Sequence, residues 1–106
     1  MTPTFSHLHV HSHYSTMDGM AVISDLVARA EELGMPAIAL TDHGNMMGAV
    51  ELLKACEKTS VKPIIGCEVF CTEKKWHLVL LAKNTMGYYN LVKIVSSNAL
   101  VWSDWV

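Results

Sequence analysis

The sequence has little charge, few cysteines and no excess of basic residues. Only 17% of its 106 residues are charged, and eight basic residues stand against ten acidic ones. This balance offers no basic surface of the kind that holds nucleic acid tightly. The three cysteines are an odd number and form no CxxC pair. They argue against a disulfide framework and favour a reducing, cytoplasmic compartment.

Long hydrophobic runs and glycine-rich signatures are also missing. No apolar stretch approaches the roughly 18 residues that a membrane span needs, and residues 1–6 do not begin a secretory signal. Neither GxxxxGK[ST] nor GxGxxG occurs, so we expect no phosphate-cradling loop. The chain is nevertheless 51% hydrophobic, and its length suits one domain. Low charge beside high apolar content predicts a face that is covered by something else.

The hydrophobic pattern predicts strands that alternate with helices. Residues 5–11 alternate strictly between polar and apolar, which indicates a strand with histidines on one face. The further predicted strands are residues 37–40, 63–70 and 76–82. The predicted helices are residues 23–33, 46–58 and 84–97. The order βαβαββα predicts an α/β fold with mostly parallel strands and right-handed crossovers.

Each predicted helix has an inner face set by its apolar spacing. In the first helix this face is Ile23, Leu26, Val27, Ala30 and Leu33. In the second helix it is Met46, Val50 and Leu53, and in the third it is Tyr88, Leu91, Val92 and Val95. Gly34 and Pro36 are predicted to end the first helix, and Asn45 to cap the second.

Polar residues follow the predicted strands. In α/β folds, functional groups gather at the carboxyl ends of parallel strands and in the loops that follow them. His9 and His11 end the first predicted strand, His43 follows the second, and Glu68 lies near the end of the third. His77 begins the fourth strand, so it joins the others only if that strand runs in the opposite direction.

The H-x-H pair and the carboxylate in an apolar strand indicate a divalent metal. Two neighbouring imidazoles are poorly placed to be protonated together and well placed to bind one cation. A plain polar strand face explains the pair equally well, and His7 and His13 leave open which histidines would bind. Glu68 lies within an apolar run, where a carboxylate needs a cation as its partner.

Spacing alone leaves other polar residues open. Asp18 is as well explained by a turn, and His77 by a half-exposed strand end. Asp42 is interpreted as a partner that orients an imidazole. Cys56 and Cys67 are predicted to be buried, unreactive thiols.

Several motifs occur in the order found in one known family. They are residues 7–12 (HLHVHS), 14–15 (YS), 17–19 (MDG), 34–45 (GMPAIALTDHGN), 48–51 (GAVE), 62–68 (KPIIGCE), 77–84 (HLVLLAKN) and 87–93 (GYYNLVK). Together they resemble the PHP (polymerase and histidinol phosphatase) domain in the form found in the α subunit of bacterial DNA polymerase III. Residues 1–97 are therefore expected to be the N-terminal part of a PHP domain, and residues 98–106 a divergent tail.

The resemblance implies the N-terminal portion of a distorted (β/α)7 barrel whose strand ends hold divalent metal ions. His and carboxylate ligands suit zinc, manganese or iron. The resemblance also implies a metal-dependent phosphoesterase linked to 3′–5′ exonuclease proofreading or to a structural role in DNA replication. DNA and other replisome subunits are the implied partners. By motif position, the implied metal ligands are His9, His11, Asp18, His43, Glu68 and His77.

The sequence also departs from the family pattern. Position 13 is His where the polymerase pattern usually has Asp, and the connection from Glu68 to His77 is short. We expect the remaining ligands, including a closing Asp-x-His pair, and the nucleotidyl-transfer residues to lie beyond this chain. A stand-alone phosphoesterase acting on a small phosphomonoester and a non-catalytic fragment therefore remain as alternatives.

Overall fold

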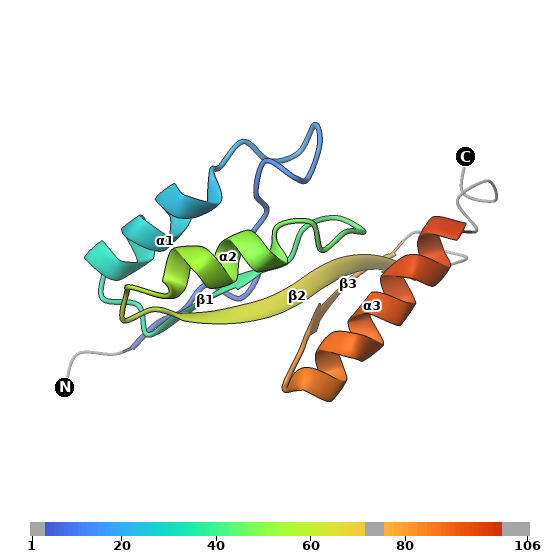
Figure 1. Cartoon of the computed structure of the whole chain (residues 1–106). Helices are drawn as coiled ribbons and strands as arrows, with labels where there is room; N and C mark the ends of the chain where they lie inside the picture. The colour runs from blue at the N-terminus through green and yellow to red at the C-terminus, as the bar shows by residue number, and fades with distance from the viewer. Residues whose placement is uncertain (1–3, 72–75, 101–106) are drawn as a thin grey trace.

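The computed structural model describes residues 4–71 and 76–100, which form a three-stranded sheet with helices packed against it (Figure 1). The elements are α1 (Ile23–Glu32), β1 (Ala37–Leu40), α2 (Ala49–Cys56), β2 (Lys62–Cys71), β3 (Trp76–Leu81) and α3 (Thr85–Leu100). Strands β1 and β2 pair in parallel, and β2 and β3 pair antiparallel. The predicted α/β class, with helices between parallel strands, is confirmed. The predicted tail lies outside the described residues from 101 onward.

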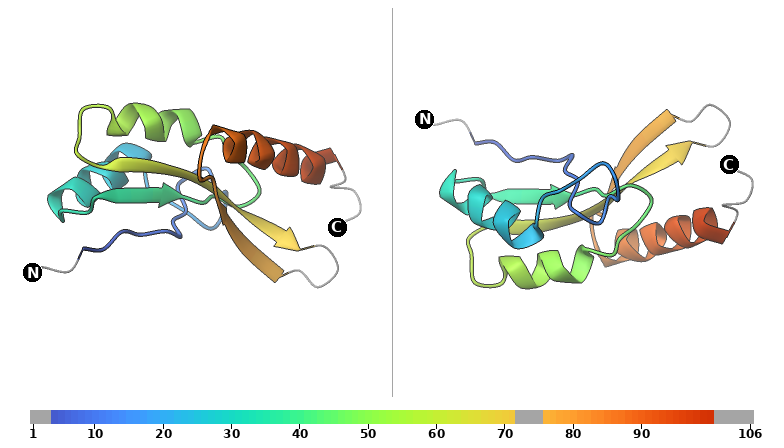
Figure 2. Two further views of the ribbon diagram at one scale, coloured as in Figure 1. Left: turned by 90° about the horizontal axis from the view of Figure 1, so that it is seen from below. Right: turned by 90° about the horizontal axis from the view of Figure 1, so that it is seen from above.

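The core lies between the helices and one face of the sheet. Figure 2 shows α2 and α3 on one side of β1 and β2, with the N-terminal segment on the side away from them. The core cluster consists of Ile23, Val27, Ala30, Met35, Ile38, Leu40, Leu52, Cys56 and Val61. Because the helices occupy this face, the polar strand ends and the loops that follow them are left free to form a site. No helix in the described ranges is long and apolar enough to cross a membrane.

The N-terminal segment, residues 5–11, runs beside β1 but is not the regular strand that its alternation predicts. The N–H of Ala39 donates to the carbonyl of His7 (2.9 Å), and the N–H of Thr41 donates to the carbonyl of Val10 (2.8 Å). A step of two residues along β1 therefore matches a step of three along the segment, so one extra residue interrupts the ladder. The N–H of Val10 donates instead to Oγ1 of Thr41 (2.9 Å). The predicted first strand is wrong for this reason.

The inner face of α2 differs from the predicted one. The buried residues are Ala49, Leu52 and Cys56, whereas Val50 and Leu53 are exposed. The helix begins at Ala49, three residues later than predicted, and the chain just before it packs too closely for a side chain. A Cβ on Gly48 would lie 2.6 Å from Cδ1 of Ile23 and 2.8 Å from Cδ2 of Leu40. This close approach fixes the rotation of α2 about its axis.

The ends of the first two helices also differ in detail. Gly34 ends α1 in the left-handed conformation (φ 72°), as predicted, and its N–H donates to the carbonyl of Glu31. Leu33 is the C-cap and is exposed, so its predicted place on the inner face is wrong. Asn45 does not cap α2. Its side-chain N–H groups donate to the carbonyls of Tyr14 and His43, and the N-cap residue is Gly48.

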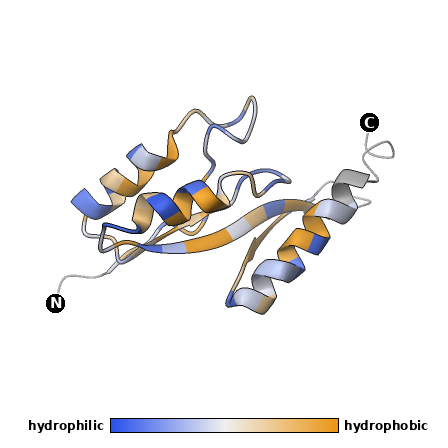
Figure 3. Ribbon diagram, viewed as in Figure 1, coloured by the Kyte–Doolittle hydropathy of each residue, from blue (hydrophilic) through white to orange (hydrophobic). Residues whose placement is uncertain are grey.

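Helix α3 packs against β2 with a small part of its apolar surface. Apolar residues are spread around this helix (Figure 3), yet among its described side chains Leu91 alone is fully buried. Tyr88 and Val95 are half-buried, and Val92 is exposed. The predicted inner face is therefore only partly formed in this chain.

Candidate metal centre

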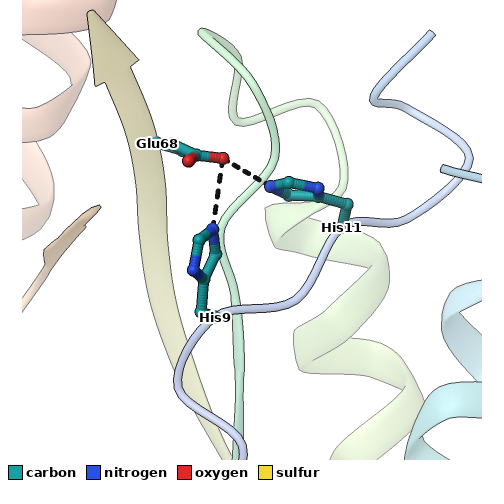
Figure 4. A group of neighbouring side chains, drawn as sticks. All are labelled: His9, His11 and Glu68. Carbon is teal, nitrogen blue, oxygen red and sulfur yellow. Dashed lines mark hydrogen bonds and ion pairs between the residues drawn. The ribbon is translucent and has the colours of Figure 1, made fainter. Parts of the chain in front are cut away.

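Glu68 is the centre of a cluster of histidines. Its side chain is only 5% exposed, and Oε2 lies 2.5 Å from Nε2 of His11, 3.2 Å from Nε2 of His9 and 3.2 Å from Nδ1 of His43. The other oxygen, Oε1, lies 3.2 Å from Nδ1 of His77. Figure 4 shows the two N-terminal imidazoles directed at the carboxylate from the segment that runs beside the strands. One buried carboxylate thus has four imidazoles around it.

Asp18 closes the same cluster from the solvent side. Its Oδ2 contacts Nε2 of His43 and lies 3.3 Å from Nδ1 of His11. His11 and His43 are therefore each placed between two carboxylates, and their ring centroids are 4.1 Å apart. The structure brings together all six residues that the motifs implied.

Strand pairing explains why Glu68 meets His43. A parallel bridge pairs the two residues beyond the end of β1. The N–H of Gly44 donates to the carbonyl of Glu68 (2.9 Å), and the N–H of Glu68 donates to the carbonyl of Asp42 (3.0 Å). The loop after β1 is thereby held against β2, which places the imidazole and the carboxylate side by side.

The β2–β3 hairpin delivers His77. Strand β3 runs antiparallel to β2, and His77 pairs with Phe70, two residues beyond Glu68. Residues two apart on a strand share a face, so His77 and Glu68 lie on the same side of the hairpin. The condition set by the sequence, that this strand runs in the opposite direction, is confirmed.

The two remaining histidines lie outside the cluster. His7 is exposed, and its ring packs edge-on against Phe5 with centroids 4.8 Å apart. The N–H of His13 donates to the carbonyl of Ala21 (2.9 Å), and its Nδ1 faces the same oxygen. The structure thus resolves which of the four N-terminal histidines face Glu68.

The donor set fits a divalent cation. A neutral imidazole has one N–H and one lone pair, so His11 cannot donate to Asp18 and Glu68 at once, and neither can His43. Nδ1 of His43 is buried and forms no hydrogen bond, although it lies beside the carboxylate. Lone pairs that face carboxylate oxygens are satisfied when a cation binds both. The donor atoms form three groups whose members all lie within 4.8 Å of one another: His9, His11 and Glu68; His11, Asp18 and His43; and His43, Glu68 and His77.

The electrostatics of Glu68 agree with this arrangement. Burial acts to raise the pKa of its carboxyl group, but hydrogen bonds from His9 and His11 and the nearby His43 and His77 lower it further, so that the pKa falls below its ordinary value. Glu68 is therefore held as a carboxylate, the form that binds a metal.

Four further residues support the cluster. Asp42 makes no hydrogen bond to an imidazole, so it does not orient one by direct contact; its carboxylate accepts hydrogen bonds from Ser12 and Ser15. Phe70 packs its ring against those of His43 and His77. Because Phe70 is two residues after Glu68, the sequence could have placed it on the same face of the strand. Nothing in the sequence indicates that Ser12 and Ser15 are buried, because their burial arises only when two distant segments meet.

The surroundings of Cys56 and Cys67 agree with the prediction that both thiols are buried and unreactive. Cys56 and Cys67 are buried and free. Burial raises the pKa of both thiols, that of Cys67 to about 11. At neutral pH they are therefore protonated and poor ligands, which leaves the histidines and carboxylates as the donors of this centre.

Imidazoles and carboxylates that converge where the parallel pairing of β1 and β2 ends define an α/β protein with a candidate divalent-metal centre. The PHP domain profile matches residues 7–104. The chain belongs to the PHP domain family, and the resemblance seen in its motifs is confirmed.

The relatives of this chain include DNA polymerases and their subunits. The DNA polymerase III subunit alpha of Borreliella burgdorferi is 47% identical over 91% of this chain, and that of Chlamydia pneumoniae is 45% identical over 88%. An error-prone DNA polymerase of Symbiobacterium thermophilum is 44% identical over 89%. The chain spans 10%, 8% and 9% of these proteins respectively. It therefore corresponds to a small part of each.

Two solved structures share the fold. An amidohydrolase of Chromobacterium violaceum superposes with a TM-score of 0.65 at 26% identity, over 84% of this chain and 32% of that one. A protein of Bifidobacterium adolescentis described as a metal-dependent phosphoesterase gives a TM-score of 0.63 at 24% identity, over 86% and 33%. Each of these folds extends well beyond the part that this chain matches.

Proposed function

We propose that this chain provides part of the divalent-metal centre of a PHP-type phosphoesterase within a DNA polymerase III α subunit. The observation that carries the proposal is the buried carboxylate of Glu68 among four imidazoles, two of which also face Asp18. The proposed ligands are His9, His11, Asp18, His43, Glu68 and His77. When bound, a divalent cation supplies Lewis-acid chemistry, which neutralises phosphate charge and lowers the pKa of water.

The exposure of the six side chains gives the centre an open and a closed side. Glu68, His11 and His43 are on the closed side, against the sheet and the loop after β1. Asp18 is 60% exposed, and His9 and His77 are also exposed. A phosphate group therefore approaches from the open side. The closed residues fix the position of the cation, and the exposed ones are within reach of the substrate.

Protons move when a cation binds. Imidazoles bind metals through a lone pair, so any that are protonated must release their proton. Binding is therefore expected to weaken as the solution is made more acidic. None of the six residues is reserved as a general base, since all of them face the cluster.

The substrate and setting are proposed from the relatives. Polymerase α subunits are 45% and 47% identical to this chain over about nine-tenths of its length, which favours a 3′–5′ exonuclease-type site acting on DNA. Other replisome subunits are the proposed protein partners. Zinc, manganese and iron are the candidate ions. The buried free thiols Cys56 and Cys67 favour a cytoplasmic location.

Metal binding is the first test. The purified full chain is stripped with a chelator, dialysed separately against Zn²⁺, Mn²⁺ and Fe²⁺, and analysed for bound metal. We expect at least about one ion per chain, and a substantial loss of binding in Glu68→Gln, because the neutral amide removes the central charge. Glu31→Gln, an exposed exchange on α1, is the matched control. A wild-type value well below one ion per chain would refute the proposed centre.

Substrate preference is the second test. The loaded chain is given a 3′-labelled DNA strand and a small phosphomonoester in parallel. Release of the 3′-terminal nucleotide supports the exonuclease-type site, whereas turnover of the monoester alone supports the stand-alone phosphoesterase. Tight metal binding with neither reaction supports a structural role. We expect no incorporation of nucleotides by this chain.

A further inference from the structure

Asp42 is a buried carboxylate that lies beside the metal centre without taking part in it. Its residue is 1% exposed. Oδ1 accepts hydrogen bonds from the N–H of Ser12 (2.6 Å) and the hydroxyl of Ser15 (2.7 Å), and Oδ2 accepts one from the hydroxyl of Ser12 (2.8 Å). Within residues 4–71 and 76–100, no cationic side chain forms an ion pair with it.

The two serines connect Asp42 to three of the proposed ligands. Ser12 follows His11 directly in the chain. The hydroxyl of Ser15 accepts the N–H of His43 (3.0 Å), and its carbonyl accepts the N–H of Asp18 (2.9 Å). One carboxylate therefore holds together the segment after His11, the turn before Asp18 and the backbone of His43.

Burial of this carboxylate needs a reason. A buried charge without a cation is costly, and three charge-assisted hydrogen bonds offset that cost only while the loop keeps one geometry. The same loop has no regular secondary structure of its own between His13 and Val22. The hydrogen bonds to Asp42 therefore hold this irregular loop in one conformation.

We propose that Asp42 is the positioning residue of the metal centre, acting through Ser12 and Ser15 on His11, Asp18 and His43. It is not a ligand. The proposal rests on the proposed metal centre and adds that some of its ligands are held by Asp42 and others are not. His77 is delivered by the β2–β3 hairpin and lies outside this hydrogen-bonded unit. Loss of the Asp42 carboxylate therefore disturbs three ligands and leaves His77 in place.

The test compares Asp42→Asn with the wild-type full chain, using Co²⁺ as the spectroscopic probe. Loss of a residue that orients metal ligands typically weakens metal binding by about 10–100-fold. We expect a loss of this size, together with a changed visible absorption band of bound Co²⁺. Asp25→Asn, an exposed exchange in the first turn of α1, is the matched control and keeps the wild-type affinity and band.

Imidazole NMR signals of the metal-free chain give an independent measurement. Asp42→Asn is expected to shift the ring signals of His11 and His43 while those of His7, whose ring lies outside the cluster, stay in place. If Asp42→Asn does not fold, Ser15→Ala removes one arm of the unit and is expected to shift the same two signals.

Two results separate this proposal from the proposed function. Wild-type affinity together with unchanged His11 and His43 signals in a folded Asp42 variant overturns the positioning role. Absence of Co²⁺ binding by the wild-type chain overturns the metal centre instead, and the imidazole signals then decide alone whether Asp42 positions these side chains.

Discussion

Replacing Gly19 by alanine perturbs the loop that carries Asp18. A Cβ at this position would lie 2.2 Å from the carbonyl oxygen of Ser12, 3.0 Å from its carbonyl carbon and 3.3 Å from Cβ of His11. A carbon atom and a carbonyl oxygen approach each other to about 3.3 Å, so one of them must move by about 1 Å. The atoms in the way belong to the backbone of Ser12, so they cannot move aside by a side-chain rotation.

The displacement has two costs. Overpacking of this kind destabilises by about 1–3 kcal/mol. The Ser12 carbonyl also accepts the N–H of Ser15 (3.0 Å), and loss of that hydrogen bond costs about 1 kcal/mol. Together we expect Gly19→Ala to lower the free energy of unfolding by about 2–4 kcal/mol. Because His11 and Asp18 flank the displaced atoms, metal affinity should fall as well, by about 10-fold or more.

Gly34→Ala is the control for this experiment. A Cβ there has nothing within 4 Å, but the residue has φ 72°, so alanine costs about 1 kcal/mol from the backbone alone. Urea unfolding followed by circular dichroism gives both stabilities, and dialysis gives both metal affinities. The reasoning is refuted if Gly19→Ala is no less stable than Gly34→Ala, or if it binds metal as tightly.

Three further predictions concern the core, the thiols and the response to acid. Leu52→Ala should lower the free energy of unfolding by about 2–5 kcal/mol in urea titrations, because Leu52 is fully buried in the core cluster. At pH 8, peptide mapping should find Cys56 and Cys67 alkylated far more slowly in the folded chain than in urea, since burial raises the pKa of both thiols; equal rates would contradict this. The metal-free chain should lose stability as the pH falls below the ordinary pKa of a glutamate. Burial acts to raise the pKa of Glu68, but the imidazoles lower it further, so the folded state holds the proton less tightly than the unfolded state. In unfolding titrations, Glu68→Gln should lose less free energy of unfolding than the wild-type chain over the same acidic range.

Local signals in the sequence were sufficient for most of the fold. The bounds of β1, Ala37–Leu40, agree with the sequence because an apolar run between Pro36 and a polar loop is too short for a helix. The bounds of β2 and β3 were predicted to within one residue. These elements are defined by composition and by neighbouring turn residues, both of which are local.

The errors occur where tertiary contacts override a local period. In α2 the spacing of Val50 and Leu53 is helical, but the close packing at Gly48 rotates the helix and leaves both exposed. In residues 5–11 the alternation fits a strand, yet the Thr41 hydroxyl captures a backbone N–H of the ladder. Neither contact can be read from one segment alone.

The candidate site could be predicted from the sequence for a different reason. His43 follows β1, Glu68 lies in the second half of β2 and His77 begins β3, and the topology of an α/β sheet brings such positions together regardless of the details of packing. His9 and His11 join them because the N-terminal segment runs beside β1. His77 depended on one topological choice, the direction of β3, and the antiparallel hairpin supplies it. What the topology does not determine is the exact approach of the side chains. That approach depends on the Asp42, Ser12 and Ser15 unit, whose members are polar, buried and distant in sequence. Variants of these residues should therefore affect binding more than exchanges of equal chemistry on the helices, although none of the three is a proposed ligand.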